Sequence, residues 1–473
     1  MPLATDHISI ELGVCVADAV VASCGIIWLF IRNLKSLSRH FFFLFFLLTT
    51  VIYLQVGPLL SLLQESVPQS LAVWGLSHPR EYLHEYAILQ TACLLLFQLP
   101  IAFLYFRMQP RQLTDVLAVV TTKRRAQITA VGCIILLIWY ACIVLKYNIF
   151  YARLGTEGSA QFIVSLPFID FIVYRSYQES ALLINGVLFI LWKIVPKSVT
   201  VLSVAFWLNL TFYGSLCLIN SRVSVIFLLI TMLSWWLALH KRSNSLPKQI
   251  LRLFLAAGVL LYLSIVVVNV RTLRMDGVSI FRYFDPTSAS GLITKSEGYS
   301  RIDGIDLMAR IRPGIFEKGL AWGEAWKGSY WLVGRFIDPE GFAASRLTMI
   351  ENAKGYLMLR YWGWATTDYL SCSLTDMYGN FGAASFIVIC GFYLWAFLFY
   401  LGCFWNPTSG KVFLMGLFLV TNILVFEGST DALLFGWVRK LPVLMLFLIA
   451  RPFVLRASPN ISSLRISPAD FRK

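Results

Sequence analysis

The stretch QITAVGCIILLIWYACIVLKY, residues 127–147, holds a single charged side chain, Lys146. A helix needs about 20 mainly apolar residues to cross the hydrocarbon of a bilayer, so this stretch predicts a membrane span. Similar apolar runs recur along the chain and predict about eleven spanning helices. They are placed near 12–31, 41–62, 86–106, 127–147, 180–195, 198–218, 223–239, 251–270, 384–404, 412–427 and 433–453.

The composition of the whole chain agrees with a membrane protein. Of its 473 residues, 58% are hydrophobic and only 14% are charged, whereas about a quarter of an ordinary soluble domain is charged. The net charge of +15 is spread between the apolar runs without a polybasic block, so we expect no nucleic-acid partner. The cysteines fall mostly in apolar runs, which argues against a disulfide framework or a metal cluster. The sequence therefore predicts an all-α, polytopic integral membrane protein.

Lysine and arginine gather in alternate short loops, and this pattern predicts the orientation, because short basic loops stay in the cytoplasm. The alternation favours an odd number of helices, with the N-terminus outside and the C-terminus inside. The basic residues on the predicted inner side are Arg32, Lys35, Arg39, Arg107, Arg111, Lys123, Arg124, Arg125, Lys193, Lys197, Lys241, Arg242, Lys248, Lys411, Arg456, Arg465, Arg472 and Lys473.

This topology divides the chain into four parts. Residues 1–270 hold the first eight helices, with a smaller outward loop near 148–178. Residues 271–383 form one long outward loop, residues 384–455 hold the last three helices, and residues 456–473 form an inner tail. The long loop is rich in charged and aromatic residues and is punctuated by glycine and proline. We therefore expect the chemistry of the protein to lie on the outer side.

Residues 300–312 of the long loop predict a short amphipathic helix. A serine and an aspartate three positions apart fit a capping pattern at its start, and the Pro-Gly pair that follows would end it. Two interpretations are open. The helix lies on the membrane surface with its charges solvated or paired, or Arg301, Asp303 and Arg310 face a substrate cavity.

The following segment of the loop is rich in tryptophan and tyrosine. Both residue types favour the headgroup level of a bilayer, so an interfacial belt is the default interpretation. The rival interpretation is that some of these rings stack on the apolar faces of sugars. The residues are Trp322, Trp326, Tyr330, Trp331, Tyr356, Tyr361, Trp362 and Trp364.

No motif of hydrolytic, nucleotide-binding or metal chemistry occurs in the sequence, and none of the five histidines lies in the long loop. We expect no metal and no cofactor. An acid or base in the loop must then be a carboxylate, a tyrosine or the substrate itself.

Arginines also stand at the predicted outer ends of helices. Snorkelling to the interface explains each of them singly. Together they predict a cationic outer cavity suited to a diphosphate, because arginine binds phosphate oxygens in a bidentate manner. They are Arg153, Arg175, Arg222, Arg271 and Arg274.

Two local stretches resemble a known family. Asn220-Ser221-Arg222 leads directly into an apolar run, and SLTDMYGNFGAA, residues 373–384, precedes the predicted ninth helix. With the many helices and the long outward loop, these stretches resemble the O-antigen polymerases, also called oligosaccharide repeat unit polymerases. The resemblance implies a membrane-embedded lipid-carrier glycosyltransferase with a GT-C-like architecture in the bacterial inner membrane.

The resemblance also implies a reaction, partners and an orientation. Such enzymes move a growing glycan from undecaprenyl diphosphate to a newly flipped lipid-linked repeat unit on the periplasmic face, to build O-antigen or a related surface polysaccharide. The implied partners are the undecaprenyl-diphosphate-linked oligosaccharide, membrane lipid and a polysaccharide co-polymerase that regulates chain length. The long loop would then be periplasmic, as would the N-terminus, and the C-terminus would be cytoplasmic.

Site roles follow from the resemblance and from the position of each residue. The predicted catalytic residues are Asp303 as general base, Asp306 as its structural alternative, and Arg301 at the diphosphate. Arg222 is the principal predicted diphosphate contact. Asp376 and Tyr378 either shape the acceptor side or set the entry to the helix at 384–404. The further predicted substrate-binding residues are Arg153, Arg175, Arg274, Arg282 and Arg310.

Three alternatives remain. A related O-antigen ligase is expected to carry a functional histidine in its long loop, which this chain lacks. A transporter or lipid-linked oligosaccharide flippase would also explain many helices and a cationic cavity. Its polar site, however, would lie at the midplane, and the central predicted spans are nearly free of charge. Asp18 in the first span is the exception and is interpreted as a helix-packing residue, and the last predicted span contains Arg439 and Lys440. The third alternative is a structural membrane scaffold.

Overall fold

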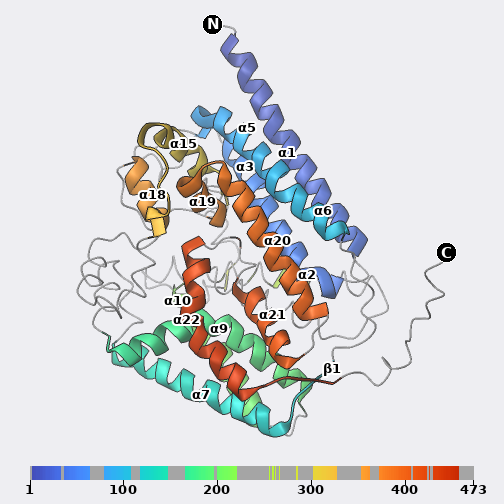
Figure 1. Cartoon of the computed structure of the whole chain (residues 1–473), viewed down its shortest axis with the longest axis vertical. Coiled ribbons are helices and arrows are strands. Elements are labelled where there is room, and N and C mark those ends of the chain that lie inside the picture. Colours follow the sequence, from blue (N-terminus) through green and yellow to red (C-terminus); the bar gives the residue numbers. More distant parts are fainter. Residues whose placement is uncertain are drawn as a thin grey trace, which may run out of the picture.

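The chain is helical throughout its described parts, apart from two three-residue strands (Figure 1). The structure is a computed structural model. It describes residues 3–33, 37–63, 79–107, 118–147, 166–195, 200–220, 302–326, 353–362, 372–405, 409–422 and 430–456, with the isolated positions 255, 258–259, 262, 266, 284–285 and 426.

The elements follow one another in chain order with short breaks. They are α1 (Leu3–Asn33), α2 (Leu37–Val51), η2 (Ile52–Val56), α3 (Gly57–Leu62), η3 (Pro79–Tyr82), α5 (Leu83–Ala92), η4 (Cys93–Gln98), α6 (Leu99–Arg107), β1 (Ala118–Val120), α7 (Lys123–Lys146), α9 (Phe168–Ile194), α10 (Thr200–Asn220), α15 (Asp306–Lys318), η7 (Glu324–Trp326), α18 (Ala353–Trp362), α19 (Ser373–Phe381), α20 (Ala384–Trp405), α21 (Gly410–Asn422), α22 (Thr430–Ala450) and β2 (Val454–Arg456).

Within the described residues, five helices are long and apolar enough to cross a membrane. They confirm a helical protein with several candidate spans, and each coincides with a span predicted from the sequence. The predicted spans at 223–239 and 251–270 lie outside the described residues, apart from isolated positions in the second. The five are Ile10–Asn33, Phe43–Leu62, Pro79–Arg107, Lys123–Lys146 and Ala384–Cys403.

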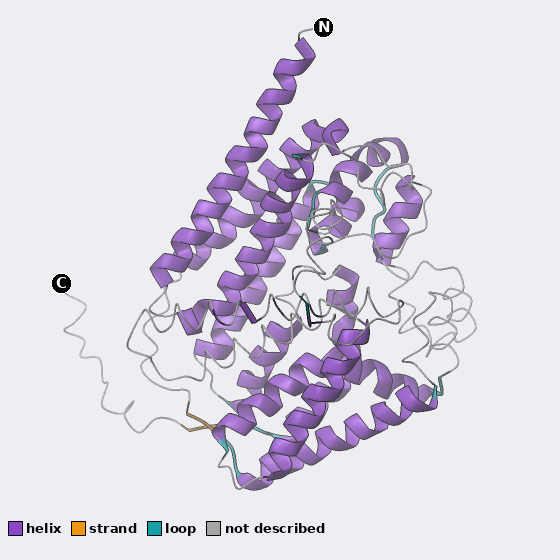
Figure 2. Cartoon of the chain, turned by 180° about the vertical axis from the view of Figure 1, so that it is seen from behind, coloured by secondary structure: helices purple, strands orange, loops and turns teal. Residues whose placement is uncertain are grey.

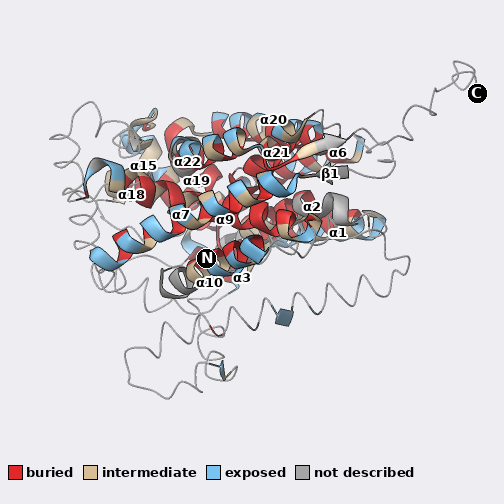
Figure 3. Cartoon of the chain, turned by 90° about the horizontal axis from the view of Figure 1, so that it is seen from below, coloured by how far each residue is buried: buried red, intermediate tan, exposed pale blue. Residues whose placement is uncertain are grey.

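The helices form two groups that pack side by side (Figures 1 and 2). The first group contains α1, α2, α3, α5, α6 and α20, and the second contains α7, α9, α10, α21 and α22. Figure 3 shows buried residues gathered inside these groups and exposed ones on their outer faces. Large apolar side chains such as Ile27, Trp28 and Ile135 are more than half exposed. An apolar outer surface is what a lipid-facing helix needs.

A third group of elements is built from parts of the predicted long loop. We call residues 302–326, 353–362 and 372–381 the loop module. Its helices α15, α18 and α19 pack on one another at one end of the first helix group (Figure 1). Tyr361 ties the module together, because its hydroxyl donates to the carbonyl oxygens of Gly319 at 3.0 Å and Gly379 at 3.1 Å.

Two membrane helices contain a π-helical segment, and three glutamines link these segments. The Gln55 amide nitrogen donates to the Gln90 carbonyl oxygen at 3.3 Å and to the Gln98 side-chain oxygen at 2.9 Å. The Gln90 amide nitrogen donates back to the Gln55 carbonyl oxygen at 3.3 Å. A π segment shifts the backbone carbonyl oxygens of a helix out of the regular pattern, and polar groups inside a membrane protein need hydrogen-bond partners from the protein itself. The glutamine side chains donate to two of these carbonyl oxygens, those of Gln55 and Gln90.

The strands β1 and β2 pair in antiparallel fashion, with Ala118 opposite Arg456. They therefore lie at the same end of the helices, although more than 300 residues separate them in the sequence. The basic-loop pattern places both segments on one side of the membrane, and their pairing agrees with that.

Two helix boundaries differ from the sequence prediction. Helix α9 begins at Phe168 rather than near residue 180, so residues 168–178 of the predicted outward loop are helical. Helix α15 starts at Asp306 and continues through Pro313, which had been expected to end it. Packing explains the second difference. A Cβ added at Gly314 would lie 2.9 Å from the Tyr361 ring, so α18 lies directly against the helix at the Pro-Gly pair.

Candidate functional site

Asp303, Asp306 and Arg310 of the loop module meet Tyr86 of α5 in one buried cluster, which we call the acid cluster. The Tyr86 hydroxyl lies 3.0 Å from Asp303 Oδ2 and 2.8 Å from Asp306 Oδ1. Arg310 Nε donates to Asp306 Oδ1 at 2.6 Å. The three loop residues are 1%, 4% and 1% exposed. The cluster therefore fixes the loop module to the helix group.

The backbone around Asp303 explains how the cluster is held in place. Asp303 Oδ1 accepts the backbone N–H groups of Ile305 at 3.1 Å and of Asp306 at 2.9 Å, which starts α15. The backbone N–H of Gly304 donates to the Tyr53 carbonyl oxygen in η2 at 2.8 Å. Asp303 thus holds the first backbone N–H groups of the helix, and the serine expected to cap it lies outside the described residues.

The geometry around Tyr86 favours a proton between the two carboxyl groups. The tyrosine hydroxyl has one hydrogen, yet two carboxylate oxygens lie within hydrogen-bonding distance of it. A proton on Asp303 resolves this, because Asp303 then donates to Tyr86, and Tyr86 donates to Asp306, which pairs with Arg310. Burial, and next the charge of Asp306, raise the pKa of Asp303 to about 7.

This raised pKa predicts a pH-dependent stability. The pKa of Asp303 is about 7 in the folded chain, against an ordinary value of 3.8. Between these values the folded chain keeps a proton that the unfolded chain has released, so the stabilising contribution is complete below the lower value and is lost as pH rises toward 7. We expect the melting temperature in detergent to fall by about 5 °C over this range because of Asp303. We expect Asp303→Asn to remove that part of the slope.

The control for this measurement is Glu317→Gln, which changes an exposed carboxylate on the same helix. It is expected to leave the slope unchanged. An identical slope in the Asp303→Asn variant and in the wild type would contradict the assignment.

A second charged group, which we call the mid-helix cluster, lies between α9 and α22. Arg439 Nη1 donates to Glu179 Oε1 at 2.8 Å, and the two side chains are 21% and 29% exposed. The charges of Arg175 and Lys440 also act on Glu179. Arg439 therefore pairs directly with Glu179, and Arg175 and Lys440 add positive charge nearby.

The mid-helix cluster places charges within two helices. Arg439 and Lys440, which fall inside the span predicted at 433–453, lie halfway along the 21-residue α22, and Glu179 lies well inside α9. Ionisable residues inside a membrane helix bundle are costly and usually mark a functional site.

The other polar residues of the predicted sites that fall within the described parts have structural partners. Asp376 Oδ2 accepts the backbone N–H of Thr430 at 2.6 Å, so it holds the start of α22. The Tyr378 ring packs edge-on against Phe386, and burial raises the pKa of its hydroxyl. Thr91 donates to Asp18 Oδ2 at 2.7 Å, which makes Asp18 a contact between α1 and α5.

One tryptophan of the loop module is presented to solvent by a constrained backbone. Trp322 is 72% exposed and has a φ of 47°, a left-handed conformation that is unusual for a bulky residue. Its backbone N–H donates to the Asn380 carbonyl oxygen at 3.1 Å, and its ring meets Phe381 edge-on. Trp326 and Trp362 are partly buried instead. Trp322 is therefore available for an interfacial or a sugar-stacking role.

The remaining predicted site residues lie outside the described residues. They are Arg153, Arg222, Arg274, Arg282 and Arg301, together with Arg271, Tyr330, Trp331 and Trp364 of the wider lists.

Sequence reasoning missed four residues that the structure brings into these clusters. Tyr86 gave no signal, because a tyrosine in an apolar run is ordinary. Glu179, Arg439 and Lys440 did give a signal, since they are charges within or beside apolar runs, but nothing in the sequence pairs them. Among the described residues, no group of three or more histidine, cysteine, aspartate or glutamate side chains could hold a metal ion.

The five apolar helices, the loop module and the two charged clusters define a helical protein of the multi-pass membrane class. Comparison of the chain with protein-family models, with curated proteins and with solved structures finds no match in any of the three.

Proposed function

We propose that the protein is a membrane-embedded glycosyltransferase that polymerises undecaprenyl-diphosphate-linked repeat units on the periplasmic face of the inner membrane. The observation that carries the proposal is the mid-helix cluster, in which Arg439 pairs with Glu179 while Lys440 and Arg175 add positive charge nearby. Cationic side chains within a helix bundle favour an anion beside them. A diphosphate on a lipid carrier supplies that anion within reach of the membrane.

The positive side chains act on the negative charge that develops during the reaction. An acceptor hydroxyl oxygen bonds to the anomeric carbon as the bond from that carbon to the diphosphate breaks. The diphosphate leaves with the electron pair, and the hydroxyl proton passes to a base. Cations preorganised at the leaving group stabilise the developing negative charge. In this proposal Arg175 and Arg439 contact the diphosphate, and Lys440 adds to the local positive charge.

Asp303 stays the base predicted from the sequence, and its pKa of about 7 suits proton transfer at neutral pH. A base must lie within hydrogen-bond reach of the acceptor hydroxyl, so this role requires that the acid cluster and the diphosphate come together during the reaction. Its oxygens already bind Tyr86 and the start of α15, so an acceptor must displace Tyr86 to reach it. Asp306, which pairs with Arg310, remains the structural alternative. Asp303→Asn separates the two roles, since asparagine keeps an oxygen for the backbone contacts but cannot take the proton.

The loop module favours polymerisation over transport. It is a folded unit attached to α22 through Asp376 and Thr430. The mid-helix cluster lies roughly 13 Å along α22 from that contact, at 1.5 Å per residue. A glycan whose diphosphate lies at the cluster would extend toward the module, where Trp322 is exposed.

We expect Trp322→Ala to raise the KM for the acceptor repeat unit about tenfold with little change in kcat, because a sugar-stacking ring contributes about 1 kcal/mol or more. The matched control is Phe316→Ala, which removes an exposed ring on α15 that is 79% exposed. Equal effects of the two variants in a reconstituted polymerisation assay would refute the stacking role.

The test of the function is the surface glycan of a strain deleted for the gene, resolved as a ladder on a gel. The proposal predicts a core capped with a single repeat unit, because export and ligation continue. Uncapped core with lipid-linked polymer outside would indicate a ligase instead. Glycan chains of normal length in the deleted strain would contradict both the polymerase and the ligase function.

Transport is the second candidate function, and the mid-helix cluster is the observation that favours it. Transporters place their polar sites near the middle of the bilayer, and Arg439 lies halfway along α22. Lipid-linked repeat units trapped on the cytoplasmic side of the membrane in the deleted strain would select this function over polymerisation.

The proposed polymerase would work beside a co-polymerase that regulates chain length.

A further inference from the structure

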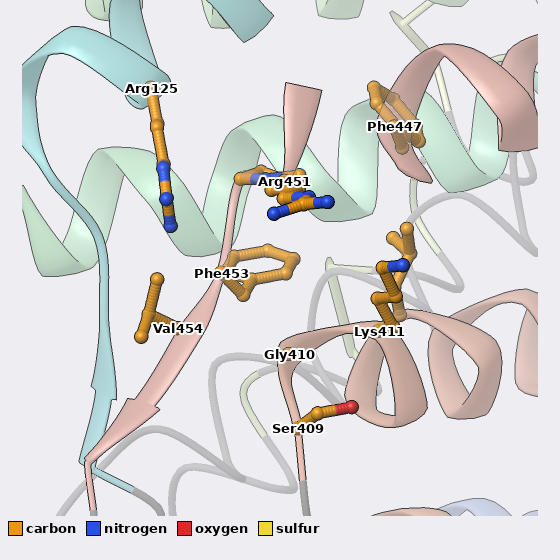
Figure 4. Close-up of a pocket in the computed structure, with 10 residues that line it drawn as sticks. Arg125, Ser409, Gly410, Lys411, Phe447, Arg451, Phe453 and Val454 are labelled. Atoms are coloured by element: carbon orange, nitrogen blue, oxygen red, sulfur yellow. The ribbon is translucent and has the colours of Figure 1, made fainter. Parts of the chain in front are cut away.

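A second cationic site lies at the opposite end of α22 from the loop module. A cavity of about 310 Å³ opens between the start of α7, the start of α21 and the segment from the end of α22 into β2 (Figure 4). This volume is at the lower end of the range of small-ligand pockets, roughly 300–1,000 Å³. The pairing of β1 with β2 lies directly beside it.

Three cations from three elements face this cavity. Figure 4 shows the side chains of Arg125, Arg451 and Lys411 around the same space, with Arg451 between the other two. No acidic side chain is among the described residues that line the cavity, and no described carboxylate pairs with any of the three cations. Three like charges around one cavity repel one another, and a bound anion removes that repulsion.

The backbone holds this arrangement under constraint. Arg451 has a φ of 47°, which glycine adopts far more easily than arginine. An arginine in a left-handed conformation points to a role for its side chain. At the start of α21, Ser409 Oγ accepts the backbone N–H of Val412 at 3.3 Å. Gly410 lies so close to β2 that an added Cβ would be 1.9 Å from the Phe453 carbonyl oxygen.

The rest of the lining is apolar, with the rings of Phe447 and Phe453 and the side chain of Leu414. An anion with an apolar attachment therefore fits both parts of the cavity. The start of α21 adds the partial positive charge of a helix N-terminus.

We propose that this cavity binds a phosphate group, either the headgroup phosphate of an anionic phospholipid or a free phosphate. The proposal stands independently of the polymerase function, because the site lies at the other end of α22 and shares no residue with the acid cluster or the mid-helix cluster. Arginine forks and a lysine ammonium are the side chains that recognise phosphate oxygens.

The experiment compares the full-length protein with the variant Arg125→Gln/Lys411→Gln/Arg451→Gly. Glycine at position 451 removes the cation and relieves the left-handed backbone, and positions 411 and 451 are exposed, so the variant is expected to fold. The control variant is Lys123→Gln/Arg124→Gln, which removes two exposed cations at the start of the same helix that do not line the cavity.

Two probes distinguish the sources of phosphate. In the first arm, protein from nanodiscs of phosphatidylcholine and phosphatidylglycerol is examined by native mass spectrometry for retained phosphatidylglycerol. In the second arm, inorganic phosphate is titrated against protein in detergent, with the melting temperature as readout. A loss of retention or of phosphate affinity of about tenfold or more in the triple variant, with the control unchanged, supports the lipid or the free-phosphate source respectively. Unchanged behaviour of the triple variant in both arms, or equal losses in the control variant, would overturn the proposal.

Discussion

Replacing Arg439 with methionine is expected to reduce polymerisation about 100-fold or more. Methionine keeps an unbranched, flexible side chain but removes the charge that pairs with Glu179 at 2.8 Å and that we assign to the leaving diphosphate. Losing one preorganised group that stabilises a developing negative charge costs about 10²–10³ in rate. The measurement is the initial rate of chain growth by purified protein in liposomes, at matched amounts of folded protein.

A paired variant separates charge from contact. The single change leaves Glu179 without the partner that the structure gives it and destabilises the bundle by about 1–3 kcal/mol. Glu179→Gln/Arg439→Met removes the carboxylate as well, so that neither member of the ion pair leaves a charge without its partner. We expect it to recover stability and a measurable part of the rate. Full activity of the Arg439→Met variant would show that Arg439 is not part of the proposed diphosphate site.

Gly57→Ala is expected to detach the loop module from the helix group. A Cβ at position 57 would lie 2.0 Å from the carbonyl oxygen and 2.6 Å from the carbonyl carbon of Ile302. Both atoms belong to the backbone, so no side-chain rotation relieves the clash, and residue 302 immediately precedes the acid cluster. We expect a loss of about 3 kcal/mol or more in stability. Activity is expected to be lost with it, because Asp303 and Trp322 are carried by the displaced module.

Gly13→Ala is the matched control for this change. Gly13 lies in α1, and an added Cβ there meets no atom within 4 Å. Alanine is the better helix former by about 1 kcal/mol, so stability is expected to stay the same or rise slightly. Thermal unfolding in detergent and limited proteolysis of residues 302–326 measure the two effects. Equal stability of the Gly57→Ala and Gly13→Ala variants would refute the close packing of the loop on α3.

Sequence patterns predicted the helices whose stability depends mainly on apolar content. The runs at 127–147 and 384–404 correspond to α7 and α20 within a few residues. Prediction was poorer where contacts with neighbouring helices determine where a helix begins. The start of α9 was misplaced because its first residues include the charges of Arg175 and Glu179, and Glu179 finds its partner only in Arg439 of α22.

The candidate sites show the same division. Asp303, Asp306 and Arg310 are close in sequence, and the spacing of the last two indicated an i,i+4 pair, which the structure forms as a buried ion pair. Their partner Tyr86 lies more than 200 residues away, and nothing in the sequence marks it. The mid-helix cluster likewise joins residues 260 positions apart.

The sequence by itself determined that the chain is a helical membrane protein, because bilayer thickness sets the length of an apolar run and the cost of burying charge limits its composition. Tertiary structure alone decided which charges meet. It placed Tyr86 between two carboxyl groups, Glu179 against Arg439, and Arg125 beside Lys411 and Arg451. The physical reason is that hydrophobic burial is additive along a chain, whereas a charge pair depends on a few ångströms between atoms that distant segments bring together.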